Sequence, residues 1–178
     1  MKHIGIAMLS LAALASGFSQ EPKSSAPASS PVVSAVRQME ERYSKNLIGA
    51  ADEMPADKYS YRPTPEQMTF AHLMMHVAQA NNGLCAALAG ETRQVKLSES
   101  DSKETLANAV KESFNYCGQA LAKADDSNLG QAVSFGEGQT STRGATLVRL
   151  AAGWADHYSA AAMYLRLNNL LPPSASKK

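Results

Sequence analysis

The sequence contains four segments in which apolar residues recur at intervals of three and four, and this pattern constrains the fold most strongly. The segments span about residues 32–53, 69–88, 102–123 and 142–167. This spacing gathers apolar side chains on one face of a helix, and no segment shows the alternating, β-branched pattern of a strand. Helices of roughly 20 residues are about 30 Å long, which suits a four-helix bundle. The sequence therefore predicts an all-α fold, a four-helix bundle.

Residues near the predicted helix ends support these boundaries. Residues 64–67 (TPEQ) have the spacing of a capping box with proline at the first helical position, which predicts a turn or helix start there. Gly90 is suited to end the second helix in a left-handed conformation, and Thr142 to cap the fourth. Pro172 and Pro173 are expected to end the fourth helix. Residues 90–101 are polar without clear periodicity, which predicts a long crossover between helices two and three.

The first 19 residues have the composition of a secretory signal peptide. Lys2 supplies positive charge, residues 4–15 are apolar, and small residues follow at Gly17 and Ser19. The apolar run is too short for a comfortable membrane span. We therefore expect export to the periplasm or the extracellular space, with no stable membrane span after the signal is removed.

The rest of the chain divides into three parts. Residues 20–31 are rich in Pro, Ser and Ala and predict a disordered tether; residues 32–174 form the helical domain, and residues 175–178 a flexible tail. Of the 17 Lys and Arg residues, one lies in the predicted signal, which leaves 16 basic against 16 acidic residues. Because a phosphate-binding surface needs an excess of cationic side chains, nucleic acid is excluded as an expected partner.

Three of the four histidines lie in predicted helices and are candidate metal ligands. His76 falls on the apolar face of helix two and is predicted to point inward, with His72 one turn away. His157 lies on helix four. Helical bundles build metal sites from inward side chains on facing helices, so His76 and His157 are expected to converge in the core. The alternative is that each is a hydrogen-bonded core histidine without a metal.

The two cysteines, Cys85 and Cys117, fall in helices two and three. In an oxidising compartment they can pair, and a disulfide closing a loop of about 30 residues contributes on the order of 3 kcal/mol in the chain-entropy model. The alternative is two small buried thiols that pack as apolar residues.

Three stretches carry a resemblance to a known family: residues 58–91, residues 106–121 and residues 156–175. Their most specific marks are a phenylalanine six residues before His76, the His-Tyr pair at 157–158 followed by Tyr-Leu-Arg, and the Pro-Pro pair. In these features the chain resembles the DinB-like superfamily of four-helix metalloenzymes, especially an exported branch. The similarity covers about residues 33–174, and Cys85 and Cys117 fall where exported relatives carry cysteines, which implies a disulfide between the two helices.

The resemblance implies a divalent ion bound by three histidines, one on helix two and two on helix four in the spacing HxxxH. His76 matches the first and His157 the last, but Gly153 stands at the remaining position. Two protein ligands hold a catalytic ion weakly, because such sites normally use three. His72 is the only other histidine near enough in sequence to replace the missing ligand. The ion expected from the resemblance is zinc, nickel or manganese.

Two classes of function follow. One is an exported domain of unknown activity with an incomplete two-histidine site. Such a domain binds a small molecule or a partner protein, and the partner can be a second copy of the chain in a homodimer. The other is a metal-dependent thiol transferase or isomerase, with a low-molecular-weight thiol as partner.

Neighbouring residues have structural interpretations. Asp156 is expected in a surface or interhelix salt bridge; the alternative, which the resemblance implies, is that its carboxylate orients the ring of His157. Trp154 is expected to occupy space near Gly153. Tyr61, Arg62, Tyr164 and Arg166 are expected to serve packing and helix-end contacts.

Overall fold

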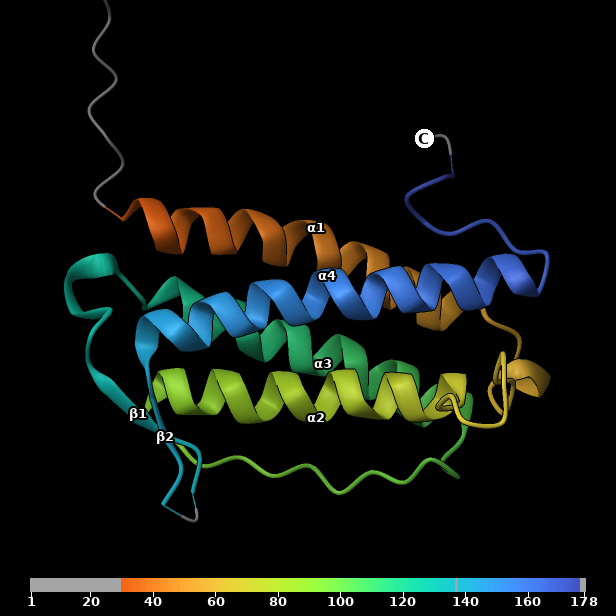
Figure 1. Cartoon of the computed structure of the whole chain (residues 1–178), viewed down its shortest axis with the longest axis horizontal. Coiled ribbons are helices and arrows are strands. Elements are labelled where there is room, and N and C mark those ends of the chain that lie inside the picture. Colours follow the sequence, from red (N-terminus) through yellow and green to blue (C-terminus); the bar gives the residue numbers. More distant parts are fainter. Residues whose placement is uncertain (1–29, 137, 177–178) are drawn as a thin grey trace, which may run out of the picture.

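The structure is a computed structural model that describes residues 30–136 and 138–176, and these form a bundle of four long helices (Figure 1). The helices are α1 (Pro31–Glu53), α2 (Phe70–Ala89), α3 (Lys103–Ala122) and α4 (Arg143–Leu167). The all-α four-helix bundle is confirmed, and every helix boundary lies within one residue of its prediction. The predicted signal peptide lies outside the described residues, as do residues 20–29 of the tether and 177–178 of the tail.

The predicted crossover makes α2 and α3 run in the same direction. Residues 91–101 carry the chain back along the length of α2 before α3 begins (Figure 1). Contacts between the two helices therefore keep one register: Asn81 contacts Ser113, and Cys85 contacts Cys117. α1 and α4 run antiparallel to this pair, because Arg37 near the start of α1 contacts Leu121 near the end of α3, and Tyr164 near the end of α4 packs against Phe70 at the start of α2.

The core lies between the four apolar faces that the periodicity predicts. Trp154 and Phe114 pack against each other there, with ring centroids 5.9 Å apart. The largest fully buried side chains come from all four helices and from Met54 after α1: Leu47, Met54, Phe70, Leu73, Met74, Leu106, Phe114, Leu121, Leu147, Leu150, Trp154 and Leu165. Burial of side chains of this size is the main favourable contribution to folding.

Polar contacts across large sequence distances join the start of α1 to the end of α3. The guanidinium of Arg37 donates to the carbonyl oxygens of Leu121, Ala122 and Ala124, at the end of α3 where α-helical partners run out. The carboxylate of Asp126 accepts from the N–H groups of Val32 and Val33 at the start of α1, at 2.8 and 2.9 Å. The end of α3 thus receives hydrogen-bond donors from α1, and the start of α1 receives an acceptor from the segment that follows α3.

Residues 125–141 contain strands, which the sequence pattern does not predict. β1 (Ala132–Ser134) pairs antiparallel with β2 (Thr140–Thr142), joined by a turn in which Gly136 and Gly138 have positive φ angles of 85° and 75°. Three residues are too few to display an alternating pattern, so periodicity cannot reveal these strands. Two short 3₁₀ turns, η1 (Ala56–Lys58) and η2 (Asp126–Asn128), complete the described elements.

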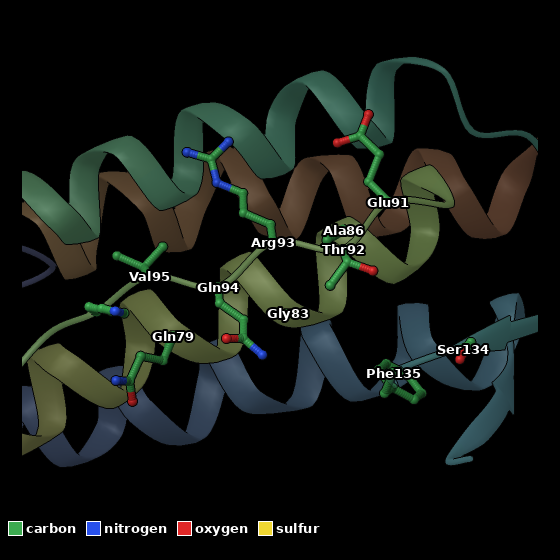
Figure 2. Close-up of a pocket in the computed structure, with 11 residues that line it drawn as sticks. Gln79, Gly83, Ala86, Glu91, Thr92, Arg93, Gln94, Val95, Ser134 and Phe135 are labelled. Atoms are coloured by element: carbon green, nitrogen blue, oxygen red, sulfur yellow. The ribbon is translucent and has the colours of Figure 1, made fainter. Parts of the chain in front are cut away.

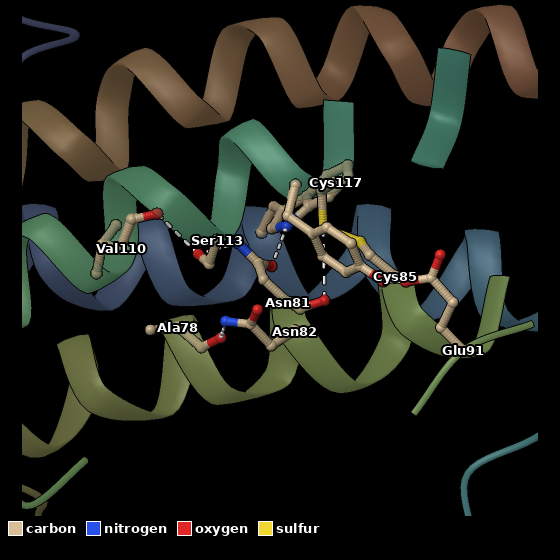
Figure 3. The surroundings of a disulfide bond; sticks show 10 residues. Ala78, Asn81, Asn82, Cys85, Glu91, Val110, Ser113 and Cys117 are labelled. Atoms are coloured by element: carbon tan, nitrogen blue, oxygen red, sulfur yellow. Dashed lines mark hydrogen bonds between the residues drawn. A yellow bond between two sulfur atoms is a disulfide. The ribbon is translucent and has the colours of Figure 1, made fainter. Parts of the chain in front are cut away.

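A disulfide joins Cys85 of α2 to Cys117 of α3, with Cα atoms 5.2 Å apart and both side chains fully buried (Figure 3). Beside it, Asn81 links three helices: its amide nitrogen donates to Ser113 Oγ at 3.1 Å, and its amide oxygen accepts from Trp154 Nε1 at 2.8 Å. The disulfide and Asn81 together fix α2 against α3 at one level of the bundle.

The helix ends largely follow the predicted signals. Gly90 has φ 72° at the end of α2, and the hydroxyl of Thr142 accepts from Ala145 N at the start of α4. α4, however, ends at Leu167 because Asn169 adopts φ 60°, so the proline pair is not the stop signal. Pro173 instead packs against Gly49 of α1. Within residues 30–136 and 138–176, no helix is long and apolar enough to cross a membrane.

Candidate functional site

The side chains of His76 and His157 meet between α2 and α4. Their ring centroids are 4.9 Å apart and the ring planes are perpendicular. The antiparallel course of the two helices brings these positions to the same level of the bundle. The contact predicted between the two imidazoles is therefore present.

The prediction that this contact lies in the core is wrong. His76 is solvent-exposed and His157 is partly buried. The buried face of α2 is formed by Leu73, Met74, Val77 and Ala78, so His76 projects from the edge of that face. Periodicity cannot separate an edge position from a central one, because both recur at helical spacing.

The two histidines line an open groove, which we call the histidine groove. Its volume is about 390 Å³, within the range of small-molecule sites. The lining residues are Glu66, Gln67, Met68, Leu73, His76, Asp156, His157, Ala160, Met163 and Tyr164. Met68 and Met163, which the sequence pattern does not single out, are 43% and 41% exposed. They give the groove an apolar rim next to its two imidazoles.

Gly153 lies directly beside His157. A Cβ atom added at Gly153 would stand 3.7 Å from His157 Cε1 and 4.0 Å from Nδ1, which is ordinary van der Waals contact, and it would meet no other atom within 4 Å. A Cβ atom at position 153 would thus stand beside the ring of His157 without a clash.

The environment of His157 lowers the pKa of its imidazole. Burial is the main cause, the neighbouring His76 adds to it, and the carboxylate of Asp156 opposes both. His157 is therefore neutral at neutral pH, and one ring nitrogen has a lone pair available for a proton donor or a cation.

His72 lies against the crossover and does not line the histidine groove. Its Nδ1 atom is 3.0 Å from Glu99 Oε2, and the other oxygen of Glu99 accepts from the hydroxyl of Thr69 at 2.7 Å. Thr69 also caps α2 by accepting from the N–H of His72. His72 thus belongs to a group of contacts that attaches the crossover to the start of α2.

Two expectations about residues near His157 are wrong. Asp156 is exposed and lines the groove, and it belongs to no ion pair among the residues that the structure describes. Trp154 does not fill the space beside Gly153, because its indole is buried in the core against Phe114 and donates to Asn81. The space at position 153 therefore stays open.

The aromatic and basic residues around α2 make structural contacts. Tyr164 donates to the carbonyl oxygen of Met68 at 2.7 Å and packs edge-on against Tyr61. Arg62 donates to the carbonyl of Pro65, and Arg166 makes a long contact to the carbonyl of Ala162. The contacts of Tyr164 and Arg62 fix the segment before α2, which forms one end of the histidine groove, whereas that of Arg166 lies within α4.

The donor set fits a three-histidine metal site only in part. Two imidazoles converge, but residues 30–136 and 138–176 contain no group of three or more His, Cys, Asp or Glu side chains placed to hold a metal ion. Two imidazoles with water can bind a cation weakly, whereas resident catalytic ions of this type use three protein ligands. We therefore assign no chemical step to a metal.

Sequence comparison identifies the family. The family model of the DinB superfamily matches residues 38–161, which include both groove histidines and Gly153. The chain belongs to the DinB superfamily. No curated protein sequence matches the chain closely enough to count as a relative.

Solved structures of DinB-like proteins share the fold. A DinB-like protein from Bacillus cereus ATCC 10987 is 15% identical with a TM-score of 0.65, over 79% of this chain and 95% of that one. A DinB-like protein from Bacillus subtilis is 16% identical with a TM-score of 0.61, over 76% and 92%. A mycothiol-dependent maleylpyruvate isomerase is 16% identical with a TM-score of 0.57, over 71% of this chain and 59% of that one. At these identities the likeness concerns the fold alone.

Proposed function

We propose that this DinB-superfamily domain binds a small molecule in the histidine groove, at an incomplete two-histidine site that holds a divalent cation only weakly. The contact between the imidazoles of His76 and His157 is the observation that carries the proposal. The groove also has the size and the mixture of apolar wall and few polar groups that ligand sites use.

The side chains of the groove define what such a ligand needs. Neutral His157 accepts a hydrogen bond from a thiol or hydroxyl group at one ring nitrogen, and the N–H of the other can donate to a carboxylate. Met68 and Met163 can cover an apolar part of the same molecule, because methionine adapts to irregular surfaces. A small acid or thiol with an apolar arm can contact both His157 and the two methionines.

Restoring the missing side chain tests the site directly. We expect Gly153→His to tighten zinc binding by about tenfold or more, because it supplies a third imidazole where the structure leaves room. Zinc affinity is measured by calorimetry, and retained metal by mass spectrometry after loading with zinc, nickel or manganese. The native protein should retain less than one equivalent.

Two variants control this experiment. His157→Ala should abolish what zinc binding the native protein has, since one imidazole alone is a poor site. Gly83→His introduces a histidine at another helix glycine, where an added Cβ atom meets nothing within 4 Å, and it lies outside the groove. This variant should keep zinc affinity at the native level. Equal zinc affinity in Gly153→His and native protein would refute the placement of the site.

Thiol-dependent chemistry is a second candidate. It is favoured by the structural likeness to an isomerase that depends on mycothiol. In this case a low-molecular-weight thiol should shift the NMR signals of His76 and His157 on titration, and the matching alcohol should not. If thiol and alcohol have the same effect, this candidate is excluded.

We also infer that the protein is exported, since the disulfide between Cys85 and Cys117 fits an oxidising compartment. Cell fractionation compares the full chain with a chain that starts at residue 20. Recovery of both in the cytoplasm would contradict export.

A further inference from the structure

A second groove crosses the exposed face of α2, between the crossover and the tip of the β-hairpin (Figure 2). We call it the crossover groove. Its volume is about 350 Å³, and it shares no lining residue with the histidine groove. Gly83 and Ala86 of α2 form its floor, and side chains from three segments surround them: Gln79 of α2, Thr92 and Gln94 of the crossover, and Phe135 of the hairpin.

The floor residue Gly83 is not explained by the fold. It lies within α2 with a negative φ, and a Cβ atom added there would meet nothing within 4 Å. Glycine is a poor helix former, so a larger residue here would favour the helix. What glycine does provide is access: without a side chain, the backbone of α2 can be approached closely by a bound molecule.

Of the three charged residues at the edge of the groove, Glu91 and Arg93 are engaged elsewhere, and the third is Lys96. The guanidinium of Arg93 lies over the ring of Tyr116, 4.3 Å from its centroid, and the carboxylate of Glu91 accepts from the hydroxyl of the same tyrosine at 2.7 Å. Figure 2 shows both side chains directed away from Gly83. These contacts fix the crossover on α3 and leave Lys96 as the remaining charged residue of the groove lining.

The uncharged groups of the lining include two amides, hydroxyl groups and an aromatic ring. Gln79 and Gln94 lie on one side of Gly83, and Phe135 lies on the other side (Figure 2). Amides donate and accept hydrogen bonds at the same time, as alcohol groups do. The phenyl ring offers an apolar face on which the C–H face of a ring can pack.

We propose that the crossover groove binds a neutral saccharide. The sugar ring packs on Phe135 above the open floor at Gly83, and its hydroxyl groups exchange hydrogen bonds with Gln79 and Gln94. This binding site is independent of the histidine groove and of any metal.

The experiment titrates the domain, residues 30–178, with maltotriose, cellotriose and triacetylchitotriose while backbone amide NMR signals are recorded. At least one of the three should shift signals of residues 79–86, 92–96 and 134–135. Gly83→Leu fills the floor, at a position where an added Cβ atom meets nothing within 4 Å, and should weaken this binding by about tenfold or more. Phe135→Ala should weaken it as well, through loss of the stacking surface.

Two matched variants show whether sugar binding is specific to the crossover groove. Gln119→Leu makes a comparable change at an exposed position of α3 outside the groove and should bind like the native protein, as should His157→Ala. The proposal is overturned if none of the three sugars shifts these signals, or if Gly83→Leu binds them unchanged. It is equally overturned if only glucose 6-phosphate binds and added salt abolishes the binding, because that result identifies an anion site at Lys96.

Discussion

Two glycines, one within α2 and one at its end, show how one residue type has opposite roles a few positions apart. Gly83 is helical with open space around it, whereas Gly90 ends the helix with φ 72°. A Cβ atom is tolerated in the first conformation and strained in the second.

The same substitution should therefore change stability in opposite directions. We expect Gly83→Ala to raise the free energy of unfolding by about 0.5–1 kcal/mol, because alanine favours the helix and restricts the unfolded chain. Gly90→Ala should lower it by about 1–2 kcal/mol. Urea unfolding of both variants measures the difference, and a loss of stability in both would contradict the open space seen at Gly83.

Two adjacent asparagines in α2 form a second contrast. Asn81 satisfies Trp154 and Ser113, while Asn82 donates to the carbonyl of Ala78 and its side-chain oxygen is buried without a partner among the described residues.

Leucine at these two positions should have unequal effects. Asn81→Leu leaves the buried N–H of Trp154 unpaired and should cost about 1–3 kcal/mol. Asn82→Leu removes an acceptor that has no partner among the described residues, so its cost should be clearly smaller. Chemical denaturation compares the two variants, and equal losses would show that Asn81 does not support Trp154 in this way.

At the scale of elements, the crossover is attached at both ends by polar side chains. Tyr116 binds its first part through Glu91 and Arg93, and Thr69 and His72 bind its last part through Glu99. The hydrogen bond from Thr69, and then that from His72, holds the pKa of Glu99 below its ordinary value.

This lowered pKa predicts a dependence on pH. The folded state favours ionised Glu99. The contribution of Glu99 to the free energy of unfolding is therefore complete above the ordinary pKa of a glutamate, and it is lost as the pH falls through the lower pKa of the folded state. Glu99→Gln should therefore be less stable than the native protein near neutral pH, and this difference should shrink in acid. Urea unfolding across the acid range tests this, with Glu112→Gln on the exposed face of α3 as control.

The elements also show what the sequence can and cannot predict. Helices of 20 residues or more display their period several times, so their ends can be predicted closely. Three-residue strands display none. The contact of Arg37 with Leu121 spans 84 residues and leaves no local pattern. In the site, the pairing of His76 with His157 follows from bundle geometry and family resemblance. The exposure of the His76 side chain, however, depends on how far α2 is rotated against α4.

At the scale of the whole molecule, the disulfide encloses the connection that lets α2 and α3 run parallel. Cys85 and Cys117 are 32 residues apart, with the crossover between them. In the chain-entropy model a loop of this length contributes about 3–4 kcal/mol, because the cross-link restricts the unfolded chain.

Removing both sulfurs should therefore lower stability substantially while keeping the fold. We expect Cys85→Ala with Cys117→Ala to lower the free energy of unfolding by about 3–4 kcal/mol, and more if the buried cavity does not close. Thermal and urea unfolding measure this, with circular dichroism to verify the helices. A double variant as stable as the native protein would mean that α2 and α3 keep their register without the bond.

The position of α1 has a consequence for the order in which the protein can assemble. α1 packs against α3 and α4 and makes long-range contacts with the last third of the chain, such as that between Tyr43 and Tyr158. A ribosome produces α1 first, yet its apolar face finds all of its partners only when synthesis is almost complete. Because α2 and α3 are made before α4, they can pair first, and the nascent chain exposes part of an apolar surface throughout elongation. A chaperone that holds this first helix would find its binding surface hidden once α4 arrives.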